Sequence, residues 1–260
     1  MKKQELKELI LKGLTNQEIA LELNVSKSTV SYQAKKMGLN NLFKYKKNES
    51  FILNKIDTSD KAYFLGFLLA DGYIGENNHV ELGVAIKDKI ILEYISKIIN
   101  SNVHDDYTFD KKKRRFPRAR TKKKINDITK FTGGRLKPDR HYPRVKDEFE
   151  KYLLLGFFDG DGCVTFGRRK DRNRLWQKVS FTSSLSLLEG IQKFLIRKLD
   201  ISTVLRPKKN ENCYVLEISN KKNVIKILDF IYLDTNIVLK RKYNKYKALR
   251  LELEENGETI

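Results

Sequence analysis

Residues 63–72 read YFLGFLLADG, and a near copy, LLLGFFDGDG, follows at residues 153–162. The repeat keeps its small and acidic residues in register, because three matched pairs are each separated by 90 positions: Gly66 and Gly156, Asp71 and Asp161, Gly72 and Gly162. Each block is an apolar run that ends in a carboxylate. The chain therefore contains two halves that share one structural plan.

Within each block the small residues lie four positions apart, as Gly66 and Ala70 and as Gly156 and Gly160. Residues four apart lie on one face of an α-helix, so each predicted helix has a face bare enough for two backbones to touch. Packing the helices through these faces brings the two closing carboxylates side by side. Two carboxylates held together favour a divalent metal site.

A simpler interpretation exists for a single block of this kind. An apolar stretch ending in Asp-Gly is usually a core helix stopped by glycine. The second copy in the same register favours a site instead. Neither run reaches the roughly 20 apolar residues that span a bilayer, so we expect no membrane partner.

Residues 64–72 and 154–162 resemble the nine-residue LAGLIDADG motif of homing endonucleases. The first block departs from the family name at its sixth position, where Leu69 replaces the acid that Asp159 supplies in the second. That position is the more variable one in the family. The resemblance implies an α+β fold in which two pseudo-symmetric αββαββα halves form a saddle of antiparallel strands laid on DNA.

The resemblance also implies a chemistry for the saddle centre. Asp71 and Asp161, with the main-chain carbonyls of Ala70 and Gly160, would bind Mg²⁺ or Mn²⁺ at the two scissile phosphates, since hard oxygen ligands suit such ions. Each active site in the family also uses a lysine, for which Lys137 and Lys240 fit. Their rivals in the same stretches are Arg135 and Lys242.

Basic residues dominate the composition and point to a polyanionic partner. The chain has 53 Lys and Arg against 33 Asp and Glu, a formal charge of +20, as expected of a nucleic-acid-binding surface. Ten of the fourteen residues from 111 to 124 are basic, and a second cluster spans residues 168–178. We expect strand side chains here to contact DNA, namely Arg114, Arg115, Arg118, Arg120, Arg168, Arg169, Arg172, Arg174 and Lys178.

The first forty residues are predicted to form a separate, all-α module. Helix patterns cover residues 2–12, a stretch opening at 14–15, and 27–37, where Ser26 is the expected N-cap and Gly38 the stop. This plan resembles helix-turn-helix domains, and a small bundle for protein contact is the alternative. Seven residues would face the major groove or phosphates: Ser26, Lys27, Ser28, Thr29, Ser31, Tyr32 and Lys35.

In the body, alternating apolar residues and helix periodicity predict the same order of elements twice. The expected elements are helices at 60–71, 88–100, 125–132, 147–160, 186–199 and 221–233, and strands at 73–74, 79–86, a hairpin across 104–124, 163–169, 175–182, 203–207 and 213–219. The helices expected at 88–100 and 186–199 share a sequence pattern at an offset of 96 rather than 90. This difference predicts a six-residue insertion in the hairpin that follows the second motif block. The predicted divisions are 1–40, a basic linker at 41–58, halves at 59–145 and 146–250, and a tail at 251–260.

Several other classes of protein lack support. Cys163 and Cys213 are the only cysteines, which argues against a zinc knuckle or disulfide framework, and no nucleotide-binding fingerprint or secretory signal is present. We therefore expect an intracellular, cytoplasmic, monomeric Mg²⁺-dependent endonuclease that cuts double-stranded DNA at specific sites. The alternatives are a maturase that binds structured intron RNA and a regulator that binds DNA without cutting it.

Overall fold

The computed structural model describes residues 3–11, 14, 16–39, 53–109, 115–169, 174–209, 213–235 and 237–255. The chain forms two compact units, Met1–Ile52 and Leu53–Ile260. The predicted DNA contacts Arg114 and Arg172, and most of the predicted linker, lie outside the described residues. No helix in the described ranges is long and apolar enough to cross a membrane.

The smaller unit contains three short helices, α1 (Lys3–Leu11), α2 (Asn16–Glu22) and α3 (Lys27–Lys36). Ser26 begins α3 as an N-cap, since its Oγ accepts a hydrogen bond from the Thr29 amide at 3.0 Å. Gly38 follows the helix with φ +69°, a conformation that glycine adopts without strain. A shared apolar cluster holds the helices together, with Leu6, Leu9, Ile10, Ile19, Ala20, Val30, Ala34 and Leu39 buried.

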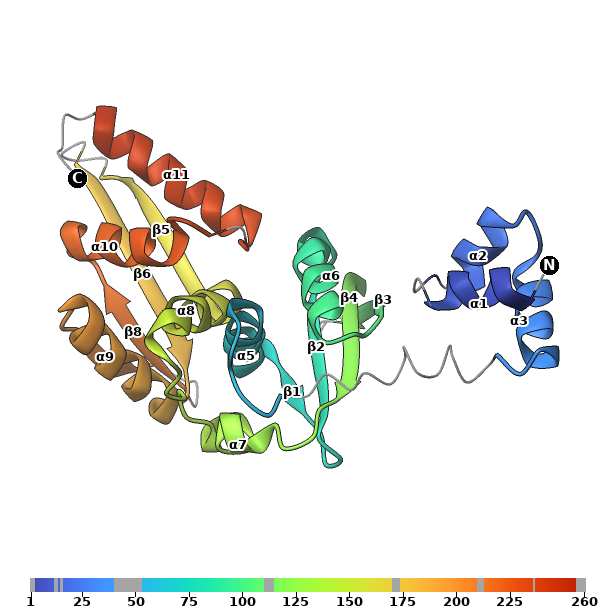
Figure 1. Ribbon diagram of the computed structural model, residues 1–260. Coiled ribbons are helices and arrows are strands. Elements are labelled where there is room, and N and C mark those ends of the chain that lie inside the picture. The colour runs from blue at the N-terminus through green and yellow to red at the C-terminus, as the bar shows by residue number, and fades with distance from the viewer. Residues whose placement is uncertain are drawn as a thin grey trace. The chain divides into compact units, whose positions relative to one another are not determined.

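The larger unit consists of two αββαββα halves, as predicted. The first comprises α5 (Ser59–Asp71), β1 (Tyr73–Ile74), β2 (His79–Ala85), α6 (Lys89–Ile98), β3 (Val103–Phe109), β4 (Arg115–Lys124) and α7 (Thr129–Thr132). The second comprises α8 (Asp147–Asp161), β5 (Gly162–Arg168), β6 (Leu175–Ser183), α9 (Leu185–Leu199), β7 (Val204–Pro207), β8 (Tyr214–Ile218) and α10 (Lys221–Tyr232). Figure 1 shows α5 and α8 packed side by side between the two halves.

Both halves build the same four-stranded antiparallel sheet, in the order β1-β2-β4-β3 and β5-β6-β8-β7. Alternation gives each sheet one buried face: Val80, Leu82 and Val84 of β2 are buried, whereas the residues between them are not. Helices of the same half cover that buried face. The expected insertion lies in the hairpin that follows the motif helix of the second half. There β5 pairs with β6 along seven residues, whereas in the first half β1 pairs with β2 along only two.

Two segments differ from the sequence-based expectation. The helix expected at 125–132 is only α7, because Asp127 adopts a left-handed backbone conformation with φ +56° and ends any regular helix before it. A last helix, α11 (Lys240–Glu255), was not predicted and runs through the expected boundary at residue 250. The buried residues of α11 are Lys242, Tyr246, Leu249 and Leu253. Because the first of them is a lysine, the buried face of this helix does not show the apolar pattern that predicts a helix.

Candidate active site at the helix pair

The motif helices α5 and α8 touch through their glycines, as the sequence predicted. A Cβ atom on Gly66 would overlap the Leu153 carbonyl oxygen and lie 2.8 Å from the Phe157 nitrogen. A Cβ atom on Gly156 would likewise overlap the Tyr63 carbonyl oxygen. Since Tyr63 and Leu153 are themselves 90 residues apart, the contact is symmetric, and each helix needs glycine where the other backbone crosses it.

The two motif carboxylates meet at the end of this contact. A Cβ atom on Gly160 would overlap the Ala70 side chain and lie 3.5 Å from Asp71 Oδ2, so Asp71 sits against the end of the opposite helix. Burial raises the pKa of Asp161 to about 6; Asp71 also raises it, while Lys137 lowers it. The negative charges of Asp71 and Asp161 therefore act on each other, as expected of two carboxylates that share one site.

The four candidate cations occupy different places. Lys137 Nζ lies 3.6 Å from Asp161 Oδ2, placed there by the short 3₁₀ turn η2 (Lys137–Asp139). Arg135 is exposed in the preceding loop. Lys240 is exposed at the start of α11, whereas the side chain of Lys242, its rival, is buried against α8. The structure thus brings Lys137 and Lys242 to the motif helices.

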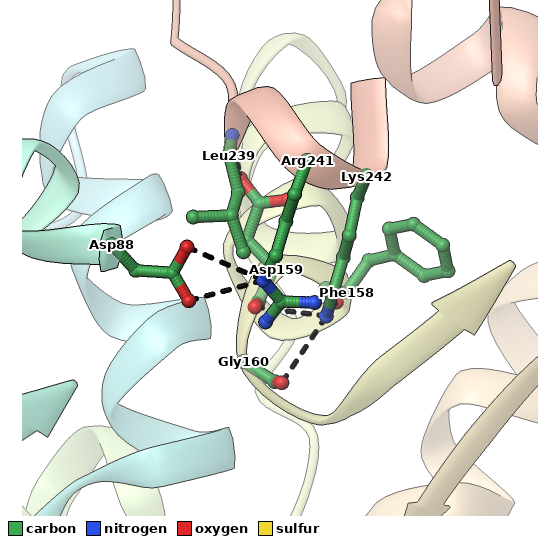
Figure 2. Close-up of polar contacts among 7 residues, drawn as sticks. All are labelled: Asp88, Phe158, Asp159, Gly160, Leu239, Arg241 and Lys242. Atoms are coloured by element: carbon green, nitrogen blue, oxygen red, sulfur yellow. Dashed lines mark hydrogen bonds and ion pairs between the residues drawn. The ribbon is translucent and has the colours of Figure 1, made fainter. Parts of the chain in front are cut away.

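Lys242 holds the end of α8. Its Nζ donates to the carbonyl oxygens of Phe158 at 2.6 Å, Asp159 at 2.9 Å and Gly160 at 3.2 Å, as Figure 2 shows. These are carbonyls of the last turn, where a helix has no amide partners of its own and where its dipole favours a cation. The side chain is 4% exposed, and burial lowers its pKa to about 8.

Arg140 binds the C-terminal end of α5 as Lys242 binds that of α8, although no sequence pattern singled it out. Its Nη1 donates to the carbonyl oxygens of Leu68 at 3.2 Å, Leu69 at 3.5 Å and Gly72 at 3.0 Å. Leu68 and Leu69 correspond to Phe158 and Asp159 at the motif offset of 90. Arg140 is 1% exposed, and burial lowers its pKa. The two cations occupy equivalent places although they differ in type and are 102 positions apart, which hides them from a repeat search.

The sixth motif position separates the two halves chemically. Asp159 Oδ2 accepts hydrogen bonds from the Tyr63 hydroxyl at 2.9 Å and from the Leu239 amide at 3.0 Å. The carboxyl group is buried, and burial raises its pKa to about 6. In the first half the equivalent residue is apolar Leu69. Asp159 therefore ties α5, α8 and the segment before α11 together in the second half alone.

A pocket of 330 Å³ opens beside Asp71. Its lining includes Asp88, Arg118, Asp159 and Arg241. The Arg241 guanidinium spans the two halves, because its Nε donates to Asp88 Oδ2 at 3.0 Å and to Oδ1 at 3.3 Å (Figure 2). This pocket places a further cation, which the sequence did not single out, near the first motif carboxylate.

The predicted DNA contacts of the smaller unit share one element. All seven are exposed or partly exposed at the N-cap or along α3: Ser26, Lys27, Ser28, Thr29, Ser31, Tyr32 and Lys35. The Ser26 hydroxyl hydrogen-bonds with those of Ser28 and Thr29 at 2.7 and 2.8 Å. The first turn of α3 thus presents a cluster of small polar groups.

The predicted contacts of the sheets are more dispersed. Arg118, Arg120 and Lys178 lie on the sheet faces opposite the helices. Arg115 stacks on the Tyr107 ring, 3.2 Å from its centroid, and Arg168 pairs with Glu252 of α11 at 2.6 Å. Arg169 and Arg174 line a 590 Å³ hollow with Trp176.

Comparison with known proteins agrees with this architecture. Residues 148–232 match the LAGLIDADG-like domain family. No curated protein sequence matches the chain.

Solved structures agree in fold at low sequence identity. The homing endonuclease I-WcaI bound to its DNA recognition sequence is 14% identical, with a TM-score of 0.55 over 79% of this chain and 92% of that one. The I-LtrWI LAGLIDADG homing endonuclease bound to target DNA is 13% identical, with a TM-score of 0.51 over 76% and 91%. This chain therefore carries a LAGLIDADG-like domain at residues 148–232 and has the fold of the LAGLIDADG homing endonucleases.

Proposed function

We propose that this chain is a site-specific endonuclease that hydrolyses both strands of a DNA duplex. One observation carries the proposal: two pseudo-symmetric helices bring Asp71 and Asp161 together in a strongly basic protein. The structures that share the fold include homing endonucleases bound to DNA. A single chain supplies both carboxylates, so a monomer contains a complete pair of sites.

The residues present fit a divalent cation. No group of three or more His, Cys, Asp or Glu side chains gathers within the described residues, so protein side chains alone would not enclose an ion. Mg²⁺ commonly uses one or two carboxylates together with substrate phosphates, which is what Asp71 and Asp161 offer. A bound cation would offset the mutual repulsion of the two carboxylates.

A bound Mg²⁺ or Mn²⁺ would supply water activation and stabilisation of the leaving 3′ oxygen. The chain itself would add positive charge around the reacting phosphates. Lys137 lies at Asp161, Arg241 lies in the pocket beside Asp71, and Lys242 and Arg140 hold the helix ends that carry both carboxylates. The outer sheet faces, with Arg118, Arg120 and Lys178, would bind the duplex.

The direct test is cleavage of a library of duplexes that carry a randomised segment. In Mg²⁺ the wild-type protein should convert a small, recurrent set of sequences into double-strand ends, and EDTA should abolish the products. The Asp71→Asn/Asp161→Asn double variant is the matched control, because it keeps the side-chain size. Binding of a recurrent sequence without any cutting would support a regulator instead, and selective binding of a structured RNA would support a maturase.

We also propose that the three-helix unit anchors the enzyme through α3 rather than completing the active site. A chain that begins at Leu53 retains both motif helices and the four cations around them. Because a tethered module raises the local concentration of its partner, its removal should weaken binding and shorten the footprint on one side without moving the cut phosphates. A shifted cut position in a folded truncated protein would contradict this role.

A further inference from the structure

Two cations near the motif carboxylates cross between the halves. Lys137, which follows α7 of the first half, pairs with Asp161 of the second motif. Arg241, which follows α10 of the second half, lines the pocket that contains Asp71 of the first motif. Each half therefore lends a cation to the carboxylate of the other half.

The two cations are held in different ways. Lys137 Nζ lies 3.6 Å from Asp161 Oδ2, so its partner is the motif carboxylate itself. Arg241 has a separate partner, since its Nε donates to Asp88 Oδ2 at 3.0 Å and to Oδ1 at 3.3 Å (Figure 2). Both bonds use Nε, so within the described part of the chain the two terminal amino groups of the guanidinium remain for a ligand. Their planar fork matches the geometry of a phosphate group.

The carboxylate of Asp88 serves Arg241 rather than its own helix. Asp88 directly precedes α6, at the position where an aspartate usually accepts a hydrogen bond from the first turn. Its side chain makes no such capping bond. The Asp88 side chain is only 12% exposed, whereas that of Arg241 is 48% exposed. The enclosed carboxylate thus orients a guanidinium that a ligand can still reach.

The surroundings of this pair strengthen its electrostatic effect. Phe67 and Ile91 line the same pocket, and charges interact more strongly beside apolar groups than in water. The charge of Arg241 also reaches the end of α8: burial raises the pKa of Asp159 to about 6, whereas Lys242 and Arg241 lower it. Arg241 therefore acts on the region where the two motif helices end.

We propose that Asp88 is a positioning residue, which holds the Arg241 guanidinium where it contacts the scissile phosphate beside Asp71. This inference rests on the proposed endonuclease function. Arg241 would be a catalytic residue, because it would stabilise the negative charge that develops on the phosphate in the transition state. One of the two strand cuts then depends on an ion pair between the halves, whereas the other depends on Lys137.

The test uses the full chain in Mg²⁺ with a target recovered from the randomised library, and it measures single-turnover cutting of each strand separately. Arg241→Met should slow the cutting of one strand roughly 100-fold, because a donor to the transition state is lost. Asp88→Asn should slow the same strand roughly 10-fold, because the guanidinium keeps its charge but loses its fixed place. Lys137→Met should slow the opposite strand. Target affinity of Asp88→Asn in EDTA should match wild type, since Asp88 itself does not contact the phosphate.

Two further variants separate positioning from a merely structural link. Asp88→Glu keeps the carboxylate and should recover part of the rate that Asp88→Asn loses. The reversed pair, Asp88→Arg with Arg241→Asp, restores opposite charges across the contact but moves the cation to its other side. The melting temperature of the reversed pair should therefore recover, whereas the slow cut should stay slow.

The matched controls come from a second ion pair of α11. Arg250 Nη1 pairs with Asp229 Oδ1 at 2.8 Å, and their side chains are 30% and 24% exposed. Neither residue lines the pocket beside Asp71. Arg250→Met and Asp229→Asn should leave the cutting rates of both strands unchanged.

Several outcomes would overturn the inference. Arg241→Met could cut both strands at the wild-type rate, the reversed pair could regain the wild-type rate on both strands, or Lys240→Met could slow the cut that Arg241→Met leaves intact. Equal slowing of both strands by Asp88→Asn would indicate a general loss of structure instead. If wild-type protein cuts no duplex of the library, the proposed function itself fails, and the inference fails with it. Thermal unfolding reports whether Asp88→Asn is folded, and replacement of the half-exposed Arg241 keeps the test decisive if it is not.

Discussion

The two halves of the larger unit share a backbone but not a chemistry. Gly66 and Gly156 contact the opposite helix in the same way, and both sheets have the same strand order. The side chains around the helix ends differ: Arg140 caps one helix and Lys242 the other, and the sixth motif position is Leu69 in one half and Asp159 in the other. Direct backbone contact constrains both halves equally, whereas the side-chain contacts at the helix ends differ between the halves.

The largest expected effect comes from the motif carboxylates, where the halves should still be equivalent. Asp71→Asn and Asp161→Asn should each reduce double-strand cleavage by roughly 10³-fold, since each removes several kcal/mol of metal-based stabilisation. Binding to the same target in EDTA should stay within a few-fold of wild type, because removing a negative charge does not weaken attraction to phosphate. The measurement is single-turnover cleavage of an end-labelled target with both strands resolved.

Asp127→Asn, which neutralises an exposed carboxylate that pairs with Lys130 at 3.3 Å, is the control for the loss of a negative charge alone. Full double-strand cleavage by either carboxylate variant would show that the two Asp residues are not both ligands. In that case the symmetry of the helix pair would not extend to the chemistry.

The glycine contacts come next, and they test the shared part of the two halves. Gly66→Ala and Gly156→Ala should each lower the free energy of unfolding by about 3 kcal/mol, because the new Cβ meets main-chain atoms that cannot move aside. Helix propensity alone would predict a gain of about 1 kcal/mol. Gly83→Ala is the control, since its nearest contact would be an ordinary 3.5 Å. Denaturant unfolding measures all three.

If one glycine variant is tolerated and the other is not, the helix contact is less symmetric than the glycines indicate. If both are tolerated, the helices separate more easily than this packing allows. Either result would remove the basis for treating the two halves as copies.

The sequence predicted the shared part well, for a physical reason. Backbone-to-backbone contact requires small residues at fixed spacing, and that requirement leaves a repeat such as Gly66 and Gly156. Strand alternation is equally local, so the spacing of Val80, Leu82 and Val84 is enough to predict β2. These features yielded the order of elements, the two halves and the meeting of the motif carboxylates.

What the sequence did not predict depends on long-range contacts. Arg140 and Lys242 reach the helix ends from segments at different distances along the chain, so no common offset reveals them. The α11 helix was missed because its first buried residue is Lys242, which a hydrophobicity pattern counts as exposed.

Replacing the cations at the two helix ends should have a smaller effect on the free energy of unfolding. These variants test the contacts in which the two halves differ. Arg140→Met and Lys242→Met should each cost about 2 kcal/mol of unfolding free energy, since each leaves buried carbonyl oxygens without a donor. Lys245→Met is the control on α11, because Lys245 is exposed and its bond to the Val164 carbonyl oxygen is long, at 3.4 Å. Exchange variants, Arg140→Lys and Lys242→Arg, should lose less than the Met variants, because either cation can donate to the last turn. A Met variant as stable as wild type would show that the cation is not needed at that helix end.

The smallest expected effect isolates the bond that only one half possesses. Tyr63→Phe removes the hydroxyl that donates to Asp159 Oδ2 at 2.9 Å and should cost about 1 kcal/mol, because the buried carboxyl group loses one of its two donors. The comparison is Tyr94→Phe, whose hydroxyl donates to Asp60 at 2.6 Å in a less buried place where water can substitute, so it should cost less. In an Asp159→Leu background, which gives the second half the apolar character of Leu69, Tyr63→Phe should have no further effect beyond its own transfer energy. An undiminished cost in that background would mean that the Tyr63 hydroxyl acts through another partner, and that Asp159 does not account for the difference between the two halves.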